Sequence, residues 1–123
     1  MTAREAAKNS RRRPPRFDLI AGNVSLDFVN TLDDRYLKPK ELLATYTDLA
    51  RFGEETGILR TVEVSRLFER SYTDSERAQQ ALVRGRELRE AMHDMFWAII
   101  HKQPVPAMAL AQLNGYAQAA AGH

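Results

Sequence analysis

Cysteine is absent from this chain of 123 residues, and its absence removes several classes of function at once. Without thiols, the chain forms neither a disulfide framework nor a thiolate-ligated zinc or iron–sulfur site. Nucleophilic catalysis would have to use serine, threonine or lysine, and none of these residues lies in a recognisable catalytic motif. The lack of cysteine also fits a reducing compartment, so we expect a cytoplasmic protein.

Long apolar runs and catalytic motifs are missing as well. No run approaches the roughly 18 apolar residues of a membrane span, and the N-terminus lacks the apolar core of a secretory signal. Glycine-rich phosphate loops, zinc-binding H-E-x-x-H motifs and nucleophile elbows are absent. His93 and His101 lie about two helical turns apart, too far to share one metal ion unaided. We therefore expect no membrane contact, catalytic residue, metal or cofactor, and we predict that the protein is not an enzyme.

The net charge of +2 hides an uneven distribution of charge along the chain. Residues 1–16 hold six basic side chains and one acidic side chain, whereas the rest holds 12 basic and 15 acidic ones. Because the segment has no apolar periodicity, we predict a disordered basic tail over residues 1–16 and one folded domain over residues 17–123. Clustered arginines attract phosphates, so the tail is either a weak, nonspecific DNA contact or simply solvated. The candidate contact residues are Arg11, Arg12 and Arg13.

Apolar spacing predicts a mostly α fold, a compact bundle of about five helices with a short N-terminal β-segment. Asn23 suits an N-cap, and Thr45 and Thr73 begin capping arrangements, with Glu76 completing a capping box for Thr73. The stretch after Asn23 also alternates as a strand does, but its three-residue repeat of apolar side chains favours a helix. The predicted elements are a strand over residues 17–20, a loop over 33–40, and helices over 24–32, 45–57, from 61, from 73 to about 102 and from 107 to about 120.

Two polar residues of the first predicted helix, Asp27 and Asn30, share one helical face. They could hold a cation, bind a small ligand or pair with an arginine. Alternatively, they are internal struts that accept hydrogen bonds from Arg86 or Arg89 where helices cross, because buried polar groups need partners. The strut is favoured, and these four residues form the candidate ligand-binding or structural polar network.

The end of the long predicted helix, residues 95–100, is apolar on all sides. This pattern indicates burial on every side or against a partner. Trp97 would be an interface anchor if it were exposed, since aromatic residues dominate binding hot spots. If the last helix folds back over it, Trp97 belongs to the core, and the sequence favours that arrangement.

The run from Phe17 to Thr31 resembles the opening of the ABATE domain, the N-terminal part of the CGNR zinc-finger family of stress-induced transcription regulators. The resemblance spans residues 17–116, and L-D-F-V-N-T is its most specific part. Val24-Ser25 stands where the family often has Pro-Ala. Further similar positions are Tyr46, Asp48, Leu49 and Phe52 for the family's Y-x-D-L-x-x-W helix, Arg86 to Ala91 with Phe96 for its R-x-L-R-E-A helix, and Leu113-Asn114 for its L-N pair.

Members of that family usually continue into further strands and a zinc-binding module, whereas this sequence ends before either. The resemblance therefore implies an ABATE-like domain that lacks its C-terminal strands and its zinc finger. The DNA-binding part of the family would be missing with them. We expect a noncatalytic regulatory domain that acts by self-association, as a homodimer, or by binding a small effector near Asp27, Asn30 and Arg89. The alternative is an orphan or truncated helical interaction module with no DNA role. An open cleft lined by Asp27, Asp33 and a histidine would contradict a purely structural role for the first helix.

Overall fold

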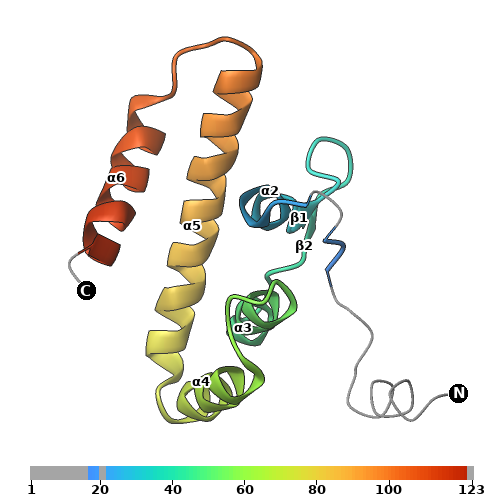
Figure 1. The fold of residues 1–123 in the computed structure, drawn as a ribbon, viewed down its shortest axis with the longest axis vertical. Coiled ribbons are helices and arrows are strands. Elements are labelled where there is room, and N and C mark those ends of the chain that lie inside the picture. Colours follow the sequence, from blue (N-terminus) through green and yellow to red (C-terminus); the bar gives the residue numbers. More distant parts are fainter. Residues whose placement is uncertain (1–16, 20–21, 122–123) are drawn as a thin grey trace, which may run out of the picture.

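The computed structural model describes residues 17–19 and 22–121, and its secondary structure is mainly helical (Figure 1). The described part holds five helices and one two-stranded antiparallel sheet, which confirms the predicted fold class. The predicted basic tail over residues 1–16, with its three candidate arginines, lies outside the described residues. In chain order, the elements are α2 (Val24–Val29), β1 (Leu32–Asp33), β2 (Lys40–Glu41), α3 (Tyr46–Glu55), α4 (Thr61–Thr73), α5 (Ser75–Ile100) and α6 (Ala107–Ala121).

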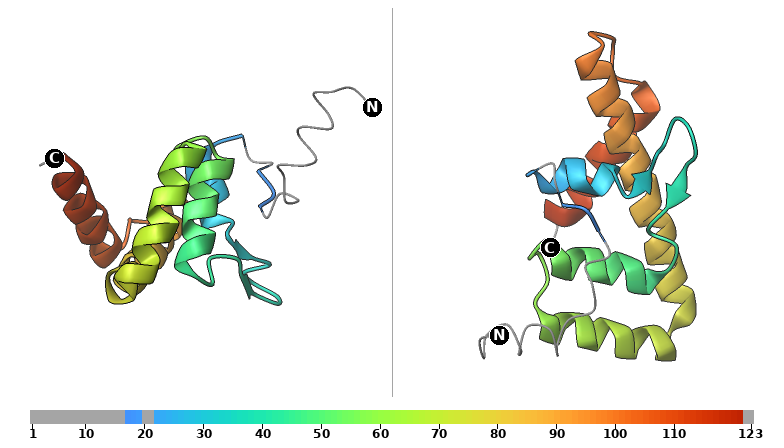
Figure 2. Two further views of the ribbon diagram at one scale, coloured as in Figure 1. Left: turned by 90° about the horizontal axis from the view of Figure 1, so that it is seen from below. Right: turned by 90° about the vertical axis from the view of Figure 1, so that its right-hand side faces the viewer.

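Helix α5 is the axis of the fold. The other four helices of the described part all contact it, and α3 and α4 also pack on each other. Helices α2, α3 and α4 lie on one side of α5, and α6 runs back along the other side (Figure 1). A second view shows α3 and α4 lying side by side across the first half of α5, with α2 and the β-hairpin farther along it (Figure 2). In the described residues, no helix is long and apolar enough to span a membrane.

The hydrophobic core lies between α3, α5 and the segments before and after the hairpin. Its buried cluster consists of Phe17, Leu43, Phe52 and Leu82. The ring of Phe17 meets that of Phe52 edge-on with centroids 5.3 Å apart, and Phe28 approaches the same ring at 5.5 Å. Burial of these aromatic rings attaches the N-terminal segment to the helices.

Residues 17–19 do not form the strand expected there. The backbone N–H of Phe17 donates to the Glu55 carboxylate at 3.2 Å, so this segment docks on α3 through a side chain instead of pairing with a strand. The β-structure lies later in the chain, where Leu32 pairs with Glu41 and Asp33 pairs with Lys40. The predicted loop over residues 33–40 is thus mainly the turn of a hairpin.

Capping side chains fix the starts of α2 and α3 where the sequence indicates. Asn23 accepts hydrogen bonds from the backbone N–H groups of Ser25 and Leu26, and Thr45 forms the predicted capping box with Asp48. Helix α2 ends at Val29, three residues earlier than expected, because Leu32 is already paired in β1.

The capping box predicted at Thr73 and Glu76 is wrong. Helix α4 continues through Thr73, whose hydroxyl donates to the carbonyl of Arg70 at 3.0 Å. Asp74 caps α5 instead, by accepting from the backbone N–H of Arg77 at 3.1 Å. Because a single residue separates the two helices, Asp74 ends one helix and begins the other.

Candidate functional site

Arg89 is a buried cation in the middle of α5, and only 3% of its surface is exposed. Its guanidinium donates to the Glu41 carboxylate at 2.8 Å and to the Glu90 carboxylate at 2.7 Å. A longer contact of 3.5 Å reaches the hydroxyl of Thr31. A buried charge needs such partners, so Arg89 ties α5 to strand β2 and to the residues that follow α2.

Arg86 and Arg35 extend this network on either side of Arg89. Arg86 donates to the backbone carbonyls of Leu43 and Ala44 at 2.9 and 3.0 Å, and its Nε lies 3.4 Å from the Glu41 carboxylate. Arg35, in the hairpin turn, donates to both carboxylate oxygens of Glu90 and to the carbonyl of Val29. The arginines therefore fasten both ends of the hairpin to α5.

Electrostatics keep the network charged. Burial alone would raise the pKa of Glu41, but hydrogen bonds from Arg89 and from the Leu43 N–H, with the charges of Arg89 and Arg86, lower it below 4.5. Burial likewise opposes ionisation of Glu90, and hydrogen bonds from Arg35 and Arg89 lower its pKa. The pKa of Arg89 is raised, because its two carboxylate partners outweigh the burial of its guanidinium.

The four residues predicted as one polar network divide into two pairs. Arg86 and Arg89 take Glu41 as their carboxylate partner, not Asp27 or Asn30 as expected. Sequence reasoning missed Glu41 because it lies in a two-residue strand next to a polar loop. One available signal was the spacing of two arginines on the inward face of the long helix, which requires an inward carboxylate nearby.

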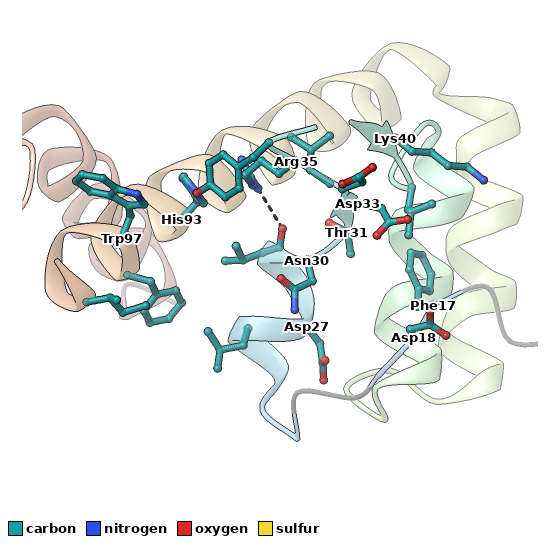
Figure 3. Close-up of a pocket in the computed structure, with 18 of the residues that line it drawn as sticks. Phe17, Asp18, Asp27, Asn30, Thr31, Asp33, Arg35, Lys40, His93 and Trp97 are labelled. Atoms are coloured by element: carbon teal, nitrogen blue, oxygen red, sulfur yellow. Dashed lines mark hydrogen bonds between the residues drawn. The ribbon is translucent and has the colours of Figure 1, made fainter. Parts of the chain in front are cut away.

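Asp27 and Asn30 instead line a cleft between α2, the hairpin and the C-terminal half of α5 (Figure 3). The cleft has a volume of about 690 Å³. Figure 3 shows Trp97 and His93 at one end, Asp18 and Lys40 at the other, and Asp27 and Asn30 between them. Other lining residues are Phe17, Leu26, Val29, Thr31, Leu32, Asp33, Asp34, Arg35, Tyr36, Leu42, Phe96, Ile100 and His101.

One end of the cleft is formed by aromatic and imidazole rings. The indole of Trp97 stacks on the His101 ring with centroids 4.1 Å apart and planes 20° apart. Across the cleft entrance, the Tyr36 hydroxyl lies 2.5 Å from His93 Nε2, and His93 Nδ1 lies 3.1 Å from the Asp94 carboxylate. Tyr36 thus connects the hairpin turn to α5.

The prediction that Trp97 belongs to the core is wrong, since 44% of its surface is exposed. Helix α6 does fold back along α5, and its Ala109 is buried. However, α6 lies on the side of α5 opposite α2 and the hairpin, so it does not cover the cleft (Figure 1). Trp97 is therefore available for contact.

The cleft bears on the expectation of a purely structural α2, because Asp27, Asp33 and His93 all line it. Two of these side chains already interact within the chain. His93 contacts Tyr36 and Asp94, while Asp27 is 7% exposed and has an interaction partner. Among the described residues, no three histidine, aspartate or glutamate side chains are grouped so that they could hold a metal ion.

A second hollow, of about 620 Å³, differs in charge from the first. It lies between α3, α4 and the start of α5, and Arg70 and Arg77 line it together with Ser71 and Thr73. Asp74 is its one lining carboxylate among the described residues. The arginines therefore dominate the charge of this hollow, whereas aspartates outnumber cations in the cleft.

The fold and the cleft define a small helical domain with a ligand-sized depression beside its N-terminal helix. The chain belongs to the ABATE family, whose model is described as "Putative stress-induced transcription regulator" and matches residues 22–123. This match confirms the resemblance seen in the sequence, and the family description is consistent with a regulatory role. Neither the curated proteins nor the solved structures contain a match to this chain.

Proposed function

We propose that this chain is the noncatalytic sensing domain of a transcription regulator and that it binds a small effector in the cleft beside α2. The cleft itself carries the proposal. Its volume of about 690 Å³ suits a small molecule, and both apolar and polar side chains line it, which gives a ligand surfaces for packing and for hydrogen bonds. The family supplies the regulatory context.

The surroundings of the cleft support a sensing role. One wall is the hairpin, which Arg35 and Tyr36 attach to α5 through Glu90 and His93. If the hairpin takes up more than one position relative to α5, a ligand that contacts both segments shifts the population toward the position that it binds best. Effector binding would in this way be converted into a change of surface at the hairpin.

Amide NMR spectra recorded with a library of charged and neutral fragments test this proposal. We expect the perturbed amides to cluster around the cleft, and Asn30→Phe, which places a ring in the cleft, to abolish the perturbation. The matched control is Asn114→Phe on the exposed surface of α6, which should leave fragment binding unchanged. Fragments that perturb only amides away from the cleft would contradict the proposal. So would fragments that bind Asn30→Phe and the unaltered chain with equal affinity.

Self-association is a second candidate, favoured by the composition of α6. The sequence of this helix contains no charged residue, although much of its surface is exposed. Large apolar side chains face solvent here: Ile100, at the end of α5, is 73% exposed, and Met108, in α6, is 76% exposed. Such a surface is usually covered by a partner, and we propose a second copy of this chain. Sedimentation velocity should show a dimer, and a strict monomer at high concentration would exclude it.

A further inference from the structure

We infer that the effector is an organic cation with an aromatic body, an inference that rests on the proposed function of the cleft. Three features of the cleft support this inference. They are the sign of its charge, the partners and direction of its two cationic side chains, and the aromatic rings at one end. Together they define the chemistry that the ligand must present.

The charge of the cleft is negative. Four aspartates line it, and three of them, Asp18, Asp33 and Asp34, are exposed. For these three side chains, the described residues provide no hydrogen bond or ion pair. A cation placed among them gains attraction from several carboxylates, and the low dielectric of the cleft wall strengthens that attraction.

The two cationic side chains of the cleft do not offset these aspartates for a ligand. The Arg35 guanidinium is already held by Glu90 and by the carbonyl of Val29. Lys40 extends away from the cleft at the end opposite Trp97 (Figure 3). An anionic ligand would therefore meet four carboxylates, with Lys40 only at the end far from the rings, and Arg70 and Arg77 make the second hollow a better place for an anion.

Rings at the other end of the cleft select an aromatic or otherwise flat apolar body. One face of the Trp97 indole stacks on His101, yet the side chain stays 44% exposed, and Phe96 and Ile100 line the wall beside it. An aromatic ring can stack here, and a nearby positive charge is attracted to the electron-rich faces of Trp97 and Tyr36. A neutral ligand would gain the stacking but not the electrostatic attraction of the aspartates.

Three probes with the same phenyl group test the inference: 2-phenylethylammonium, 2-phenylethanol and 3-phenylpropionate. Trp97 is the one tryptophan of the chain, so its emission reports on the aromatic end directly. We expect the cation to bind with the lowest Kd of the three and the anion with the highest. We also expect the cation to shift the amide signals of cleft residues in NMR spectra.

Two double variants assign the preference to the cleft. Asp33→Asn/Asp34→Asn removes two lining charges, and asparagine tolerates the positive φ of 48° at position 34. It should weaken binding of the cation about three- to tenfold and leave 2-phenylethanol unchanged. Glu54→Gln/Glu69→Gln removes the same charge from α3 and α4, outside the cleft, and should change neither Kd appreciably.

The outcomes separate this inference from the proposed function. If the alcohol or the carboxylate binds in the cleft as tightly as the amine, the cationic class is wrong while effector binding in the cleft stands. If the amine binds equally well to both double variants, the aspartates do not select it and the inference fails. If addition of the amine causes no saturable change in Trp97 emission, the inference also fails. Fragment mapping with Asn30→Phe then decides whether the cleft binds any small molecule.

Discussion

Two regions of α5 differ in which side chains they bury: the middle of the helix buries a charged side chain, and its C-terminal end exposes apolar ones. In the middle of the helix, the Arg89 charge is buried and fully engaged by carboxylates. At the C-terminal end, Trp97 and Ile100 are exposed and the neighbouring α6 carries no charge. The charge in the first region is paired within the chain, whereas the apolar side chains in the second region are not covered by the described residues. The Arg89 network therefore holds the scaffold, whereas a binding surface is expected at the C-terminal end of α5.

Replacing Arg89 by methionine should break the first region and have the largest effect. The variant leaves the Glu41 carboxylate without its main partner inside the fold, and losing one member of a buried pair costs about 3 kcal/mol of unfolding free energy. Urea unfolding followed by circular dichroism measures the change. The matched variant Arg84→Met, on the exposed surface of α5, should stay within about 0.5 kcal/mol of the unaltered chain. Equal stability of the two variants would show that the network is not structural.

Acidification should weaken the same region by a smaller amount. Folding lowers the pKa of Glu41 and Glu90, so their contribution is fully present above pH 4.5 and is lost as the pH falls through the lower folded values. The urea midpoint should therefore decrease below pH 4.5, and this decrease should be shallower in Glu41→Gln. Glu69→Gln, on the exposed surface of α4, serves as the control and should retain the full decrease. Identical acid profiles for the unaltered chain and Glu41→Gln would contradict the assigned electrostatics.

Changing the second region should have the smallest effect on stability. Ile100→Lys places a charge at a position that is 73% exposed, so the unfolding free energy should change by no more than about 0.5 kcal/mol. If two copies associate through this surface, the dimer should weaken by roughly tenfold or more in sedimentation experiments. Ile58→Lys, at a 62% exposed position between α3 and α4, should leave association unchanged. A dimer that resists Ile100→Lys would place the interface elsewhere.

Local signals predicted the helices well, because the groups that determine them are neighbours in sequence. Asn23 and the Thr45–Asp48 pair cap their helices as expected, and α5 and α6 end within two residues of the predicted positions. The one wrong cap, at Thr73, arises because α4 runs on until Asp74 and leaves no separate linker. A short linker between two helices cannot be located from apolar spacing alone.

The site was less predictable, because it depends on contacts between distant segments. Asp27 and Asn30 were identified as candidates, yet the carboxylate that pairs with Arg89 comes from Glu41, 48 positions earlier in the chain. The exposure of Trp97 follows from the side of α5 on which α6 packs, and no local pattern specifies that side. The cleft itself exists only because α2 and the hairpin pack beside the C-terminal half of α5.

Intermolecular NOEs between 2-phenylethylammonium and the protein would locate the probe and so decide whether the cleft beside α2 is a binding site. We expect NOEs from the probe ring to the indole protons of Trp97 and from the probe methylene groups to the amide protons of Asn30. These NOEs should be absent in Asn30→Phe. NOEs confined to the outer surface of α6 or to the hollow at Arg70 and Arg77 would show that the cleft is not the binding site.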